Sequence, residues 1–115
     1  MPRDRDSLLD ILESASIAID MIGSKNADEL EDDLLVQSAV CYRFIVIGEA
    51  ATRVSDETQQ RYPQLPWSYM RGMRNFVAHQ YDDVDFQIVL KTVREDLPGL
   101  MAEIERILAA EWPTE

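Results

Sequence analysis

The sequence predicts an all-α protein, an antiparallel up-and-down bundle of four main helices plus one short helical segment. Apolar residues return every three or four positions along almost the whole chain, which is the period of an amphipathic helix. Alternating runs bounded by Asn-Gly or Asp-Gly are missing, and only 4 glycines are available for tight turns. With 115 residues, 46% of them hydrophobic, the chain is expected to form a single helical domain over residues 1–115.

The first half of the chain predicts two long helices. The first is expected to begin near Asp4–Ser7, with either residue as its N-cap, and to end near Gly23. The second is expected from about Asp28 to Val54, because apolar residues recur at helical spacing and carboxylates lie in its first turn. Cys41 lies among apolar neighbours within this helix and is expected to pack as a small hydrophobic residue.

The middle of the chain predicts a short helix, a loop and a third main helix. The short helical segment is expected over Ser55–Gln60, and the loop over Pro63–Pro66, because residues before proline avoid the helical conformation. Pro66 then stands at a favourable position for opening a helix. The third main helix is therefore expected from Trp67 to about His79.

The last part of the chain predicts a connection followed by a fourth main helix. Asp82, Asp83 and Asp85 form the connection, and one of them is expected to cap a helix that extends through Glu111. Pro98 lacks a backbone donor and crowds the carbonyl four residues earlier. The final helix is therefore expected to kink or split near residue 96.

The charge of the chain limits the classes of function that it can serve. The 22 Asp and Glu against 11 Lys and Arg give a net charge of −11, so the whole surface cannot coat nucleic acid. Residues 41–81, however, carry five arginines against three carboxylates, together with the single histidine. This segment either admits a polyanion at one place or is simply the buried middle of the chain, and composition leaves both alternatives open.

Composition also indicates a compartment. The single Cys41 excludes a disulfide framework and a multi-cysteine zinc site. Aspartates interrupt the N-terminus where a signal peptide needs apolar residues. No uninterrupted apolar run approaches the roughly 18 residues of a membrane span. The sequence therefore predicts a cytoplasmic protein without a membrane anchor.

The third helix carries two faces of opposite character. At ~100° per residue, its apolar side is expected to face the core and consists of Tyr69, Met70, Met73, Phe76 and Val77. The opposite side spans an arc of about 140° by the same arithmetic and consists of Arg71, Arg74, Asn75 and His79. This polar face contains no carboxylate, although the chain is rich in them.

The polar face has the groups needed for phosphodiester cleavage. Guanidinium groups match phosphate oxygens. His79, at the end of the helix, titrates near neutrality and could move protons. The alternative is an ordinary solvated helix face. His79 with Asp82, Asp83 and Asp85 could also be a set of metal ligands, although helix capping is the simpler explanation of these aspartates.

A single histidine constrains how RNA could be cut. General acid–base cleavage uses one group to take the 2′-OH proton and another to protonate the leaving 5′-oxygen, but each chain offers only His79. Two chains paired about a two-fold axis would supply both imidazoles and gather four arginines in one groove. We therefore expect a homodimer with the site at its interface.

An ordered set of motifs resembles the HepT-like toxins, a branch of the HEPN-domain ribonucleases. Arg74-Asn-Phe-Val-Ala-His79-Gln-Tyr81 is similar to the Arg-x4-His-x-Tyr motif of that family. The further motifs occur in the family's order along most of the chain and are Ile47-Gly-Glu-Ala50, Tyr62-Pro63, Pro66-Trp67, Gly72-Met-Arg-Asn75 and Asp96-Leu-Pro98.

The resemblance implies an all-helical, dimeric toxin that cuts RNA without a metal or another cofactor and leaves a 2′,3′-cyclic phosphate. In the family the motif arginine and histidine form the catalytic pair, here Arg74 and His79. From the polar helix face we add the hypothesis that Asn75 and Arg71 position the substrate. The resemblance also implies a partner, a minimal nucleotidyltransferase antitoxin that adenylylates Tyr81 and assembles with the dimer. A different function, that of a non-catalytic helical partner of a nucleotidyltransferase, is the alternative.

Overall fold

The computed structural model describes residues 2–80 and 83–113, apart from the side chains of Pro2, His79 and Gln80. All regular structure within these residues is helical, so the predicted all-α class is confirmed. The elements in chain order are α1 (Pro2–Ile22), α2 (Ala27–Glu31), α3 (Leu34–Arg53), α4 (Asp56–Arg61), α5 (Trp67–Gln80), α6 (Phe86–Lys91), the π-helical segment η1 (Thr92–Asp96) and α7 (Leu97–Glu111).

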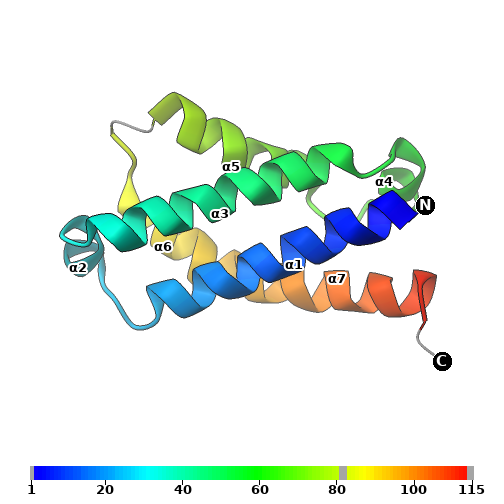
Figure 1. The fold of residues 1–115 in the computed structure, drawn as a ribbon, viewed down its shortest axis with the longest axis horizontal. Coiled ribbons are helices and arrows are strands. Elements are labelled where there is room, and N and C mark those ends of the chain that lie inside the picture. The colour runs from blue at the N-terminus through cyan, green and yellow to red at the C-terminus, as the bar shows by residue number, and fades with distance from the viewer. Residues whose placement is uncertain (1, 81–82, 114–115) are drawn as a thin grey trace.

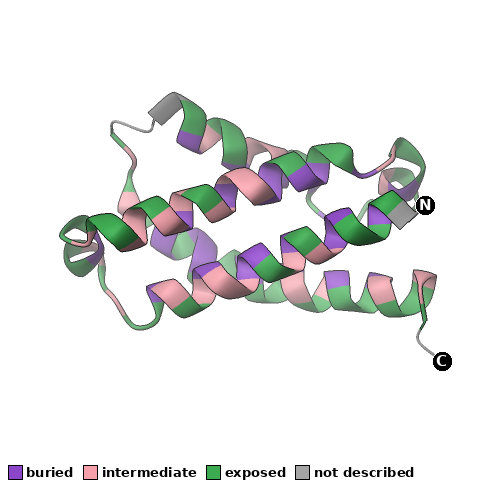
Figure 2. Cartoon of the chain, viewed as in Figure 1, coloured by how far each residue is buried: buried purple, intermediate pink, exposed green. Residues whose placement is uncertain are grey.

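The four main helices lie side by side along the long axis of the molecule (Figure 1). α3 packs between α1 and α5, and α7 packs against α1. The fourth main helix is the continuous run of α6, η1 and α7. The inward faces of these helices bury one apolar core (Figure 2), whose fully buried members include Leu8, Ile11, Ile47, Met70 and Ile104.

The expected cap of the first helix is wrong. α1 begins at Pro2, so Asp4 and Ser7 lie inside it, and each is only 2% exposed. Asp4 instead joins α1 to α4: its Oδ1 accepts from the Ser55 N–H at 2.9 Å, and its Oδ2 accepts from the Ser55 and Thr58 hydroxyls at 2.6 Å each. These long-range partners are invisible to local sequence patterns. A residue typical of a helix start therefore connects two helices.

The expected continuous helix from Asp28 to Val54 is interrupted. α2 ends at Glu31 and α3 starts at Leu34. Asp33 caps α3, because its side chain accepts from the Val36 N–H at 3.1 Å. Gln37 donates to the carbonyls of Leu30 and Glu31 at 2.8 Å each. The interruption between α2 and α3 therefore costs little free energy, because side chains form hydrogen bonds with the backbone groups that it exposes.

α3 is also long and apolar enough to cross a membrane, judged by length and composition alone. This differs from the prediction that no segment could span a membrane, which rested on the lack of an uninterrupted apolar run. Arg43 and Glu49 interrupt the apolar residues of α3, but the helix is apolar enough on average. In the fold, α3 is the helix on which both α1 and α5 pack. The core helix of a bundle commonly has this composition.

The remaining elements follow the sequence closely. α4 covers the predicted short segment, and α5 begins directly after Pro66 as predicted. Asp85 caps α6 by accepting from the Gln87 N–H at 3.0 Å, which confirms the capping role expected for one of the three aspartates. Asp82 lies outside the described residues.

Pro98 disturbs the fourth helix where it was expected to do so. The five residues of η1 form a π-helical turn immediately before Leu97 and Pro98. The Leu97 N–H donates to the carbonyl of Thr92, five residues earlier. Because a wider turn accommodates a proline without breaking the helix, the chain continues in nearly the same direction into α7.

Candidate nucleic-acid interface

The two faces of α5 are arranged largely as predicted. Met70, Met73 and Val77 are buried, and Phe76 packs against the core from a partly buried position. Tyr69 differs from the prediction, since it is 44% exposed at the edge of the apolar face. Its hydroxyl donates to Asp96 Oδ2 at 2.6 Å and lies 3.1 Å from Thr92 Oγ1. Burial and then the Asp96 carboxylate raise the pKa of Tyr69, so the phenol remains protonated near neutrality.

A glycine contact fixes the position of Arg74. A Cβ placed on Gly48 would lie 2.5 Å from the Arg74 Cβ, 2.9 Å from its backbone nitrogen and 3.1 Å from the Met70 carbonyl oxygen. These distances leave no room for any side chain at position 48. The absence of a side chain therefore lets α5 cross directly over α3 at Arg74.

The same crossing brings a carboxylate to Arg74. Arg74 Nε lies 3.6 Å from Glu49 Oε1, and both side chains are half-exposed. This separation is longer than a hydrogen bond, and an exposed pair of this kind contributes at most about 1 kcal/mol to stability. The helix face is free of carboxylates in the sequence, but the fold supplies one from α3. An incoming phosphate would compete with Glu49 for Arg74.

Arg71 is held by a neutral side chain. Its Nη1 donates to Gln59 Oε1 at 3.1 Å, and the Gln59 amide donates in turn to the carbonyls of Val54 and Ala51 at 2.9 and 3.3 Å. In the described part of the chain, Arg71 forms no ion pair. Its charge is therefore oriented by α4 without being neutralised.

The other predicted site residues are placed to different extents. Asn75 is exposed, one residue beyond Arg74. The backbone of His79 belongs to α5, but its side chain lies outside the described residues, as does the whole of Tyr81. The structure therefore joins Arg71, Arg74 and Asn75 on one exposed helix face and leaves the positions of the His79 and Tyr81 side chains as predictions.

Sequence reasoning missed two residues at this face. Glu49 and Gln59 contact the two arginines but lie in other helices. Only Glu49 could have been found from the sequence. Its neighbour Gly48 is a glycine inside a predicted helix and inside the Ile47–Ala50 motif, and such a glycine indicates close packing against another helix. Gln59 had no local signal.

The arrangement can bind phosphate through two guanidinium groups and an amide on one helix. Arg71 and Arg74 are neighbours at i, i+3, so their side chains share the same side of α5. Cys41 is not part of this face; it packs against the core, and burial raises the pKa of its thiol. Among the described residues, no three His, Cys, Asp or Glu side chains are arranged to hold a metal ion.

Comparison with known proteins finds relatives along most of the chain. A family model described as Ribonuclease HepT-like matches residues 11–107. A Methanocaldococcus jannaschii protein named as a putative RNase is 33% identical over 85% of this chain and 90% of its own length. A Thermococcus cleftensis protein named "Probable ribonuclease HepT" is 32% identical over 85% of this chain and 93% of its own. No solved structure matches the chain.

Proposed function

The chain belongs to the ribonuclease HepT-like family, and from this premise we propose that it is a metal-independent endoribonuclease that acts as the toxin of a toxin–antitoxin pair. The observation that supports this function is the exposed face of α5. Two arginines and an amide lie together there, although the chain carries a charge of −11. Such a local cationic face suits a substrate held by its phosphates at one place.

Each residue of this face has a proposed role. Arg74 stabilises the negative charge that develops on the scissile phosphate, while Asn75 and Arg71 position the RNA strand. A His79 imidazole takes the proton from the ribose 2′-OH, whose oxygen attacks phosphorus as the bond to the 5′-oxygen breaks. A second imidazole gives a proton to the leaving 5′-oxygen. The products are a 2′,3′-cyclic phosphate and a free 5′-hydroxyl.

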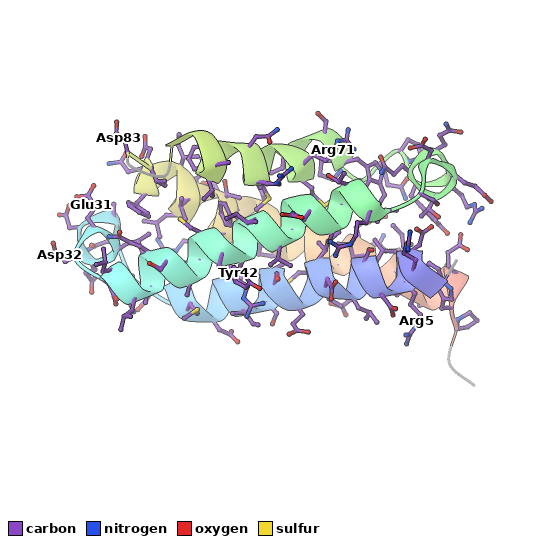
Figure 3. The ribbon with its side chains drawn as sticks, turned by 45° about the horizontal axis from the view of Figure 1, so that its top comes forward. Arg5, Glu31, Asp32, Tyr42, Arg71 and Asp83 are labelled. Carbon is purple, nitrogen blue, oxygen red and sulfur yellow. The ribbon has the colours of Figure 1, made fainter. Side chains whose placement is uncertain are left out.

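The second imidazole comes from a second copy of the chain. An apolar stripe on α3, formed by Leu35, Ala39, Tyr42 and Val46, supports this pairing because its spacings alternate between four and three as in helix–helix seams. Leu35 is 85% exposed and Tyr42 56% exposed in the single chain. Tyr42 on α3 and Arg71 on α5 can be followed in Figure 3.

The next position of the same stripe is Glu49, which lies beside Arg74. A two-fold pairing along the stripe would therefore bring the cationic faces of both copies toward one groove. Leu35→Lys would place a charge in this seam and should convert a dimer into monomers. Sedimentation of wild type and variant measures this change, and a wild type that is monomeric at high concentration contradicts the pairing.

The proposed partner is a minimal nucleotidyltransferase antitoxin, which assembles with the dimer and inactivates it at Tyr81. The Tyr81 hydroxyl attacks the α-phosphate of ATP, AMP becomes attached to the phenolic oxygen, and pyrophosphate leaves. The attached nucleotide adds bulk and negative charge two residues from His79. Both effects would oppose entry of an RNA phosphate.

The decisive experiment compares wild type, His79→Ala and a matched surface variant, Arg106→Ala. Arg106 is an exposed arginine on α7, a helix that contributes no residue to the cationic face, and it pairs with Glu103 of the same helix. We expect wild type and Arg106→Ala to cleave RNA and arrest growth on expression, and His79→Ala to do neither. Equal behaviour of wild type and His79→Ala would contradict the nuclease and favour a non-catalytic binding protein.

Two further conditions test the chemistry. A chelator should leave RNA cleavage unchanged, whereas a requirement for added magnesium would contradict metal independence. Raising the salt concentration should weaken RNA binding, because phosphate contacts release counterions. RNA binding that is insensitive to salt would argue against phosphate recognition by Arg71 and Arg74.

A further inference from the structure

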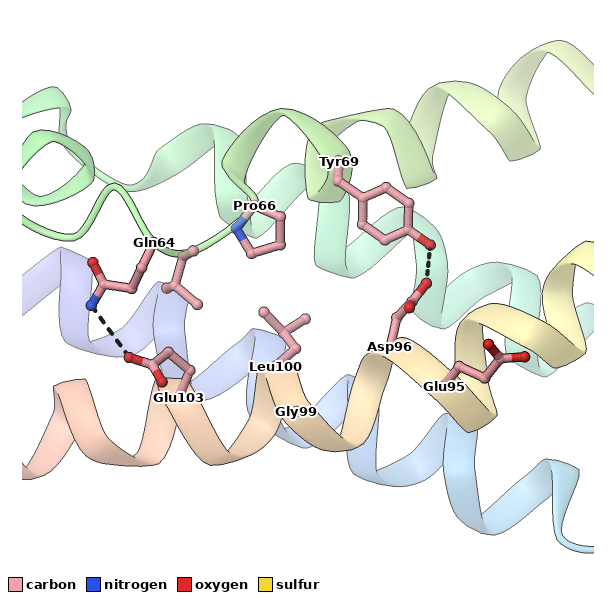
Figure 4. Close-up of a pocket in the computed structure, with 9 residues that line it drawn as sticks. Gln64, Pro66, Tyr69, Glu95, Asp96, Gly99, Leu100 and Glu103 are labelled. Atoms are coloured by element: carbon pink, nitrogen blue, oxygen red, sulfur yellow. Dashed lines mark hydrogen bonds between the residues drawn. The ribbon is translucent and has the colours of Figure 1, made fainter.

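A second surface lies on the opposite side of α5 from Arg74. Two cavities open between α5 and the continuous α6–η1–α7 helix, and Tyr69 lines both. The first, of about 600 Å³, is drawn in Figure 4 and is lined by Gln64, Leu65, Pro66, Tyr69, Glu95, Asp96, Gly99, Leu100 and Glu103. The second, of about 250 Å³, is lined by Phe44, Tyr69, Gly72, Met73, Phe76, Ile88 and Thr92. Together they form what we call the Tyr69 groove.

The two cavities differ in chemistry. The first has apolar residues on both walls, Pro66 at the start of α5 and Leu100 on α7. Three carboxylates line the η1–α7 side: Glu95, Asp96 and Glu103 (Figure 4). Asp96 accepts from Tyr69, and Glu103 accepts from Gln64 at 3.3 Å and pairs with Arg106 at 3.3 Å. The second cavity is almost wholly apolar. The Tyr69 groove therefore has an anionic end and an apolar end.

Two helix-interior glycines line this groove, one in each cavity. Gly72 lies in α5 and Gly99 in α7, and neither has a positive φ. A Cβ placed on either would meet no atom within 4 Å. A glycine inside a helix costs about 1 kcal/mol relative to alanine. Close packing explains the glycine at position 48, and a positive φ explains the glycine at position 23. Neither reason applies to Gly72 or Gly99 within the single chain.

An occupant that approaches the helix backbones closely would explain both glycines, because their missing side chains leave the surface open at the base of each cavity. The carboxylates select the charge of that occupant. A nucleic acid strand would be repelled by them, and so would a second copy of a chain whose net charge is −11. A cationic partner with large apolar side chains matches both ends of the groove.

We propose that the Tyr69 groove binds a basic amphipathic helix of a partner protein, with Lys or Arg side chains at Glu95 and Glu103 and an apolar side chain in the cavity beside Gly72. Recognition of this kind uses apolar anchors on one face of a helix laid into a groove. Gly72 lies about 160° around α5 from Arg74 at ~100° per residue. The bound helix would therefore leave the cationic face accessible to RNA.

The test uses a fluorescein-labelled synthetic helical peptide with Leu on one face and Lys on the other, measured by fluorescence anisotropy. Two matched peptides carry Glu in place of Lys, or Ser in place of Leu. We expect the Leu/Lys peptide to bind wild type and the two altered peptides to bind at least about tenfold more weakly, the equivalent of 1.4 kcal/mol. No binding of the Leu/Lys peptide, or equal binding of all three peptides, would overturn the proposal.

Protein variants test whether the peptide binds at the Tyr69 groove. Gly72→Leu places a side chain in the apolar cavity from a position whose Cβ has open space, and Glu95→Gln/Glu103→Gln neutralises the anionic end. Each should weaken binding of the Leu/Lys peptide about tenfold or more. The matched control Glu13→Gln/Glu105→Gln removes two exposed carboxylates elsewhere and should bind as wild type does. Equal binding by wild type and both groove variants would overturn the proposal.

Measuring RNA cleavage by the groove variant tests the groove proposal independently of the proposed nuclease function. Gly72→Leu should cleave RNA at the wild-type rate, because position 72 faces away from Arg74. Displacement of the peptide by an RNA oligonucleotide would show one shared site and overturn the assignment of a separate groove. Loss of peptide binding in Gly72→Leu with intact cleavage is the expected result.

Discussion

The two sides of α5 differ in almost every property that governs binding. One side exposes Arg71, Arg74 and Asn75, and its only acidic neighbour in the ion pairs of the described residues is Glu49. The other side contains Gly72 and Tyr69 and meets the carboxylates of η1 and α7. One helix therefore presents cations on one side and borders anions on the other, and the residues of the two sides are only a few positions apart in the sequence.

This difference shows how an acidic protein can bind a polyanion. The net charge of −11 repels phosphate from most of the surface, while the local charge of α5 favours it at one face. Carboxylates elsewhere then help to confine the strand to that face. The following predictions test this contrast, from the largest expected effect to the smallest.

Arg74→Ala should reduce RNA cleavage by about a hundredfold or more, because it removes a charge aimed at the scissile phosphate. Arg74→Lys should recover part of the loss, since it restores the charge but not the forked donors. Single-turnover cleavage of a labelled RNA measures both effects. If Arg74→Ala loses no more activity than the surface control Arg106→Ala, the cationic face is not the catalytic one.

Alanine at Gly48 and alanine at Gly72 should change stability in opposite directions. Gly48→Ala should lower the free energy of unfolding by about 1–3 kcal/mol, because its Cβ would overlap the Arg74 backbone. Gly72→Ala should raise it by up to about 1 kcal/mol, because the space is open and alanine favours the helix. Urea denaturation measures both. Destabilisation by Gly72→Ala would mean that the Tyr69 groove is filled within the single chain.

The hydrogen bonds from α4 to Asp4 should make the attachment of α4 to α1 sensitive to acid. Because Gln59 of α4 accepts a hydrogen bond from Arg71, the position of Arg71 should be affected as well. Burial alone would raise the pKa of Asp4, but hydrogen bonds from Ser55 and Thr58 outweigh it and lower the pKa below the ordinary value of an aspartate. Asp4 therefore stabilises the fold fully above the pKa of the unfolded chain, and this stabilisation is lost as the pH falls through the lower, native pKa.

Asp4→Asn should accordingly lower the free energy of unfolding at pH 7 by about 1–3 kcal/mol, because the charged acceptor of three hydrogen bonds is lost. Denaturation curves from pH 7 to strong acid should show the difference from wild type shrinking only in acid. Asp20→Asn, at an exposed position on α1, is the control. An equal effect of both variants would contradict the role of Asp4.

Glu49→Gln should produce the smallest effect, a two- to fivefold tightening of RNA binding at low salt, because an exposed ion pair contributes at most about 1 kcal/mol. The variant removes both a negative charge and a competitor for Arg74. Titration of a labelled RNA measures the change, and high salt should reduce it. Weaker binding by Glu49→Gln would indicate that Glu49 orients Arg74 for its substrate.

The sequence predicted the parts of this molecule that depend on neighbours along the chain. Helical periodicity located the four main helices. The prolines located the start of α5 and the disturbance before Pro98, and the angular positions of residues around α5 separated its two faces. The errors arose at aspartates. Asp4 looked like a cap and is a buried acceptor, whereas Asp33 lay inside a helix that seemed continuous and is the N-cap of α3. The same residue type serves both roles, and only its distant partners decide between them.

The motif that indicated the family, Arg74 through Tyr81, was readable in the sequence because its residues keep a fixed spacing along the chain. Only the tertiary structure decided what surrounds it. Gly48 sets how closely α5 approaches α3, and that approach places Glu49 beside Arg74. The Tyr69 groove likewise exists only because the fourth helix packs alongside α5. Helix formation and helix faces depend on residues a few positions apart, whereas a charge or cavity shared by two helices depends on packing that no local pattern encodes.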